Sequence, residues 1–68
     1  MSDLIESQVE EDRALVLEVL SDAPQSATEV AISAGISLKA AERALWSLNT
    51  AGKVRADREE ITLIWSRT

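Results

Sequence analysis

Apolar positions recur at helical spacing in the first third of the chain. Over roughly residues 8–21 they form one stripe, which consists of Leu15, Val16, Val19 and Leu20. The acids before this stripe suit the positive end of a helix dipole: Glu10, Glu11 and Asp12. Because proline disfavours helical geometry in the residue before it, Pro24 is expected to end this helix. Residues 1–7 are expected to form a flexible N-terminal arm, unless Leu4 and Ile5 extend the helix.

The next segment predicts two helices joined by a tight turn. Ser26 and Glu29 have the spacing of a capping box, in which each side chain bonds to the backbone amide of the other residue. A short helix is expected over about 27–34, with an inward-facing set of Val30, Ala31 and Ala34. Gly35 is expected to end it in a left-handed conformation, and Ser37 to cap a third helix. Two helices joined in this way make a helix-turn-helix.

The third helix is expected over about 38–50, where a second apolar stripe consists of Ala41, Ala44, Leu45 and Leu48. Residues 53–56 then alternate between polar and apolar, as in a half-buried strand. The polar run 57–60 predicts a turn, and residues 61–65 predict a returning strand. Both faces of that strand carry apolar side chains, which leaves two candidates for the core-facing position, Leu63 and Ile64. These segments predict a mainly α fold with a small β-hairpin, in the α+β class.

Length and composition limit the function. A chain of 68 residues is one domain, expected over residues 8–68. It has no Cys and no His, which excludes disulfides, Cys/His zinc sites and His-based catalysis. The carboxylates are scattered and two glycines cannot form a phosphate-cradling loop, so no enzymatic activity, metal or cofactor is expected. No apolar run has the length of a membrane span, and the first residues lack the pattern of a signal peptide. A soluble, cytoplasmic protein without a membrane partner is therefore expected.

The net charge of −5 is unevenly distributed. Residues 1–22 hold seven acids against one base, whereas residues 23–68 hold five acids against six bases. This asymmetry either orients the protein on a charged partner or belongs to a solvated helix face.

A family resemblance becomes visible from Thr28 to Val54, in the run TEVAISAGISLKAAERALWSLNTAGKV. This run resembles the winged helix-turn-helix DNA-binding domains of small transcriptional regulators. The resemblance implies that the terminal hairpin, over 53–66, is the wing. It also implies that the protein binds double-stranded DNA and regulates transcription.

The candidate binding surface lies on the outer face of the third helix. Opposite the apolar stripe, one continuous stripe consists of Lys39, Arg43, Trp46 and Thr50. In a helix-turn-helix this face enters the major groove, where Arg and Lys reach guanine edges or phosphates. An exposed Trp is typical of binding hot spots. The wing adds further candidates for contact with nucleic acid, Lys53, Arg55, Arg58 and Trp65.

A second resemblance rests on the runs RALWSL, GKV and IWS, which are similar to the Z-alpha domains that bind left-handed nucleic acid. Arg43 and Trp65 match that pattern, and Trp46 stands where the family has Tyr. Glu42 stands where the family has Asn, and the wing lacks the family's prolines. The resemblance implies that the two Trp rings touch and join the third helix to the wing.

Three alternatives stay open from the sequence. The domain is a DNA-binding regulator, or it is a winged-helix adaptor that docks to a protein. Trp46 belongs to a binding surface, or it closes the edge of the core against Trp65. Two copies pair through the first helix with the side chains of Leu4, Ile5 and Val9, or these side chains cover the domain's own core.

Overall fold

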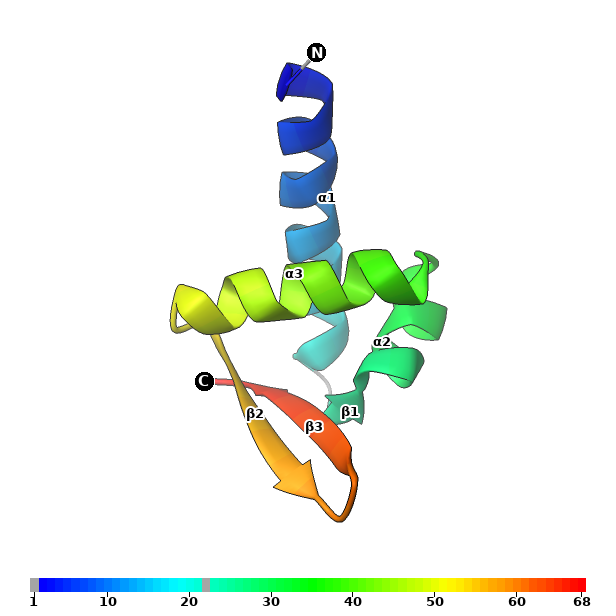
Figure 1. Cartoon of the computed structure of the whole chain (residues 1–68), viewed down its shortest axis with the longest axis vertical. Helices are drawn as coiled ribbons and strands as arrows, with labels where there is room; N and C mark the ends of the chain where they lie inside the picture. Colours follow the sequence, from blue (N-terminus) through cyan, green and yellow to red (C-terminus); the bar gives the residue numbers. More distant parts are fainter. Residues whose placement is uncertain (1, 22) are drawn as a thin grey trace.

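The computed structural model describes the backbone of residues 2–21 and 23–68, and the side chains of residues 8–21 and 23–68. The elements follow in the order α1 (Ser2–Leu20), β1 (Gln25–Ser26), α2 (Ala27–Ala34), α3 (Leu38–Thr50), β2 (Val54–Glu59) and β3 (Thr62–Arg67). Figure 1 shows the three helices above a twisted hairpin, with the middle of α3 crossing the C-terminal half of α1. This architecture confirms the predicted α+β winged helix-turn-helix.

The core is aliphatic except for one Trp, and it lies where the three helices meet the hairpin. Its buried members are Val16, Leu20, Val30, Ala31, Ala41, Ala44, Leu45, Leu48, Val54 and Trp65. All four positions of the stripe predicted for the third helix are buried. The prediction for α2 is confirmed at Val30 and Ala31, whereas Ala34 is half-buried.

Helix α1 begins at Ser2, six residues before the expected start at residue 8. Its N-terminal part projects past α3, away from the rest of the domain (Figure 1). The backbone of Leu4 and Ile5 belongs to α1, so these residues extend the helix. Their side chains lie outside the described residues, so the flexibility of residues 1–7 and pairing through Leu4 and Ile5 stay predictions.

Because α1 begins at Ser2, the acids Glu10, Glu11 and Asp12 lie in its middle. The prediction that they lie at its positive end is therefore wrong. Asp12 is buried and accepts a hydrogen bond from Gln8 at 3.1 Å.

The helix-turn-helix confirms the local predictions. The Ser26 hydroxyl accepts from the Glu29 amide at 3.3 Å, and the Glu29 carboxylate accepts from the Ser26 amide at 3.0 Å. Gly35 ends α2 with a φ of 71°, and the Ile36 amide then donates to the Ala31 carbonyl at 3.1 Å. Ser37 caps α3 by accepting from the Ala40 amide at 3.1 Å. This turn fixes the direction in which α3 leaves α2.

The hairpin is longer than predicted. Strand β2 continues to Glu59, which pairs with Thr62, so the loop consists of Glu60 and Ile61 only. The predicted turn over 57–60 is therefore wrong for its first three residues. They are charged because the hairpin extends beyond the core and both of its faces meet water there.

A third strand completes the sheet, in the order β1-β3-β2. Strand β1 was not predicted, because it is two residues long and forms only by pairing with β3 across 38 or more positions of sequence. The open choice on the last strand is resolved in favour of Leu63, which packs against the core together with Trp65. Ile64 points to the opposite face, since neighbouring residues of a strand alternate.

Candidate nucleic-acid interface

The outer face of α3 is solvated along its length. Because the opposite stripe is buried in the core, helical geometry turns Lys39, Arg43, Trp46 and Thr50 to the outside, and all four are exposed. The Thr50 hydroxyl donates to the Trp46 carbonyl at 3.0 Å. The structure therefore brings the four predicted residues of α3 onto one surface.

The two Trp side chains join α3 to the hairpin. Their ring centroids lie 4.8 Å apart and their planes are inclined by 88°, an edge-to-face contact. Trp46 remains 50% exposed, whereas Trp65 is only 1% exposed. Trp65 thus lies in the core, and its ring packs against the ring of Trp46. Its own ring offers almost no area to a partner.

The hairpin has two faces that the strand register distinguishes. Arg58 is opposite Leu63, on the face that packs against the core and turns toward Trp46. Arg55 is opposite Ser66, on the other face, where its guanidinium forms two hydrogen bonds of 3.1 Å with the Asp57 carboxylate. These hydrogen bonds and the charge of Asp57 raise the pKa of Arg55. The structure therefore separates Arg55 from the surface of α3.

Lys53 is exposed at the opposite end of the hairpin from Arg58. It lies in the connection after α3, where its amide donates to the Leu48 carbonyl at 2.9 Å. That bond holds the start of the hairpin against the end of α3. Asn49 adds a second link, because its side chain donates to the Val54 carbonyl at 3.2 Å.

A groove lies between the start of α2, α3 and the tip of the hairpin. Residues that line it include Thr28, Glu42, Trp46, Ile61 and Leu63. Ile61 is 92% exposed at the hairpin tip, although it is among the most apolar residues of the chain. Sequence reasoning assigned Ile61 to a strand and missed the groove. The sequence feature that could have indicated this exposed position is a large aliphatic residue directly after a run of four charged residues.

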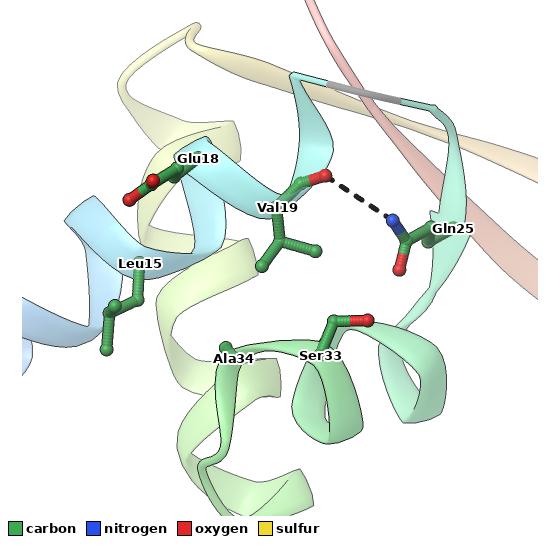
Figure 2. Close-up of a pocket in the computed structure, with 6 residues that line it drawn as sticks. All are labelled: Leu15, Glu18, Val19, Gln25, Ser33 and Ala34. Atoms are coloured by element: carbon green, nitrogen blue, oxygen red, sulfur yellow. Dashed lines mark hydrogen bonds between the residues drawn. The ribbon is translucent and has the colours of Figure 1, made fainter.

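A second hollow lies on another part of the domain, lined only by α1, β1 and α2. Figure 2 shows Leu15, Val19 and Ala34 around it, with Glu18 and Ser33 at its margin. The Gln25 side chain donates to the Val19 carbonyl at 3.4 Å and so ties β1 to the end of α1. This hollow contains none of the predicted interface residues.

Two features are absent from the described part of the chain. No group of three or more Asp and Glu side chains there is arranged to hold a metal ion. No helix there is long and apolar enough to cross a membrane.

Comparison with known proteins identifies the fold. No family model matches the sequence, and no curated protein matches it. Among solved structures, the chain is similar to the homodimeric winged helix-turn-helix DNA-binding domain of a possible ArsR-family transcriptional regulator from Mycobacterium bovis. The TM-score is 0.76 at 22% identity, over 97% of this chain and 68% of that one.

Two further structures show the same fold. The Zalpha domain of PKZ from Carassius auratus, in complex with Z-DNA, has a TM-score of 0.77 at 17% identity, over 91% of this chain and 98% of that one. ZitR from Lactococcus lactis, a zinc-responsive MarR family member, has a TM-score of 0.71 at 21% identity. The match covers 85% of this chain and 42% of the ZitR chain, so this chain spans less than half of that regulator. At these identities the likeness establishes a winged helix-turn-helix fold.

Proposed function

We propose that this domain binds double-stranded DNA as a transcriptional regulator, with α3 in the major groove and the hairpin beside it. The observation that carries the proposal is the outer face of α3, where Lys39 and Arg43 lie on the turns before a half-exposed Trp46. Burying half of a Trp ring on a partner removes apolar area from water, and the two cations suit phosphates or guanine edges. Two structural neighbours support DNA as the partner: the DNA-binding domain of a possible transcriptional regulator and a domain in complex with Z-DNA.

The proposed contact set differs from the full set of sequence candidates. It consists of Lys39, Arg43, Trp46, Thr50 and Arg58, with Lys53 at its margin. Trp65 acts through Trp46, because its own ring is buried. Arg55 is left out, because it lies on the far face of the hairpin and is paired with Asp57.

A matched pair of variants tests the proposal. Arg43→Gln and Arg55→Gln each remove one positive charge from an exposed side chain, so their effects on net charge are equal. Fluorescence anisotropy with mixed-sequence duplex DNA should show that Arg43→Gln weakens binding about tenfold or more, whereas Arg55→Gln changes it about twofold at most. If Arg43 contacts a phosphate, its loss also reduces the salt slope by about one unit. Equal effects of the two variants, or no binding by the parent at low salt, would contradict the proposal.

We further propose that two copies pair through α1, since its N-terminal part projects past α3 (Figure 1). The structural neighbour from Mycobacterium bovis is homodimeric, which supports pairing of two copies. Pairing would double the DNA contacts of a domain whose single basic surface is small. Sedimentation should show a dimer in the parent and a monomer in Ile5→Glu. A monomeric parent at high concentration would disprove pairing and leave DNA binding by one copy.

A protein partner is the second candidate function. It is favoured by the groove, which is lined by the exposed apolar side chains of Trp46 and Ile61 together with an acid, Glu42. Salt separates the two functions, because DNA affinity that depends on phosphates falls steeply with salt and an apolar interface does not.

A further inference from the structure

Glu42 is the only acid on α3, and it lies beside the proposed contact residues. It directly precedes Arg43 and stands one turn before Trp46, with which it lines the groove. Among the described side chains, the ion pair that forms joins Arg55 and Asp57, and Glu42 takes part in none. An exposed carboxylate therefore faces any DNA that contacts this surface.

A carboxylate cannot bind DNA through phosphates, because the two groups repel each other. It accepts hydrogen bonds only, so its partner must be a donor. In the major groove the donors are the N4 amino group of cytosine and the N6 amino group of adenine. The adenine amino group is next to N7, an acceptor that repels a carboxylate, whereas the outer neighbour of the cytosine amino group is a C–H. Cytosine is therefore the better partner for Glu42.

We propose that Glu42 is a specificity-determining residue that accepts a hydrogen bond from the N4 amino group of a cytosine in the major groove. The inference rests on the DNA binding proposed above. Arg43, the next residue on α3, would contact a guanine or a phosphate beside that cytosine. The carboxylate then gives sequence preference at the cost of weaker binding to all other sequences.

The experiment selects duplexes from a randomised pool with the parent protein and measures affinity for the enriched sequence. One position should be cytosine, and its replacement by thymine or by N4-methylcytosine should weaken binding about tenfold or more. Glutamine pairs with the N6 and N7 atoms of adenine, so Glu42→Gln should shift the preference at that position from cytosine to adenine.

Glu59→Gln is the matched control, because it removes the same charge from an exposed carboxylate on the outer face of β2. It should raise affinity for all duplexes alike and keep the preference for cytosine. If Glu42→Gln behaves in the same way, Glu42 only repels DNA and the inference fails while DNA binding stands. If the parent binds DNA but prefers no cytosine at any position, the inference also fails while DNA binding stands. If the parent enriches no duplex, the proposed function itself fails.

Discussion

Helices α2 and α3 follow each other directly and are both capped by Ser, yet their first turns differ in charge. In α2 the cap is reciprocal, because Glu29 bonds back to Ser26 and places an acid at the positive end of the helix dipole. In α3 the residue at the equivalent position is Ala40, and the first turn holds Lys39 and no acid. A cation at that end of a helix is unfavourable.

Both helix starts are capped by Ser, but the charge in the first turn stabilises α2 and is unfavourable in α3. A residue whose charge is unfavourable for its local structure, and which gains no compensating contact in the fold, is expected at a functional site. Lys39 forms no ion pair among the described residues, and it is exposed on the face proposed for DNA. The comparison therefore supports the proposed role of Lys39 in DNA binding.

Packing rather than capping should dominate the stability of α3. Leu45 is fully buried, and Leu45→Ala should lower the free energy of unfolding by about 2–5 kcal/mol, enough to unfold much of so small a domain. Leu38→Ala is the matched control, since Leu38 lies on the same helix and is 46% exposed. Urea denaturation should show a much smaller loss for Leu38→Ala. Equal losses would disprove the core assignment.

Loss of the Ser caps should have the next largest effect on the free energy of unfolding. It tests the comparison between the starts of α2 and α3 directly. Ser26→Ala and Ser37→Ala should each cost about 0.5–2 kcal/mol. We expect the larger loss for Ser26→Ala, because it removes one bond of a reciprocal pair, whereas Ser37 forms a single bond. Thermal unfolding of the two variants side by side measures the difference. A larger loss for Ser37→Ala would show that the two bonds of the capping box do not reinforce each other.

Lys39→Glu should reverse the unfavourable charge at the start of α3. It is expected to raise the free energy of unfolding by about 0.3–1 kcal/mol at low salt. The same variant should weaken DNA binding, so stability and binding move in opposite directions. Denaturation and anisotropy on one preparation measure both. A variant that gains stability and keeps full affinity would show that Lys39 has no role in binding.

The smallest effect concerns pH. The backbone and side-chain hydrogen bonds with Ser26 lower the pKa of Glu29 below its ordinary value of 4.5. A lowered pKa in the folded state stabilises the fold above the ordinary value, and the contribution is lost as the pH falls through the folded value. Glu29→Gln should therefore melt below the parent at pH 7 and converge with it in acid. A constant difference between the two melting temperatures from pH 7 to pH 3 would contradict this.

Short-range features were predictable from the sequence. The bounds of α2 and α3, the capping box, the left-handed Gly35 and the buried stripe of α3 all follow from interactions that span at most a few residues. The same stripe placed four candidate residues on the outer face of α3, because helical periodicity determines both faces at once.

Contacts between distant segments were decided by the tertiary structure. Strand β1 exists only through its pairing with β3, and Asp12 is buried although the two acids before it, Glu10 and Glu11, are exposed. The register of the hairpin put Arg58 toward α3 and Arg55 away from it, since a shift by one residue exchanges the two faces of a strand. Charge and hydrophobicity of single residues do not encode that register. The register is set by packing, because the face of the hairpin that carries Trp65 is buried against the helices. The opposite face of the hairpin stays in water.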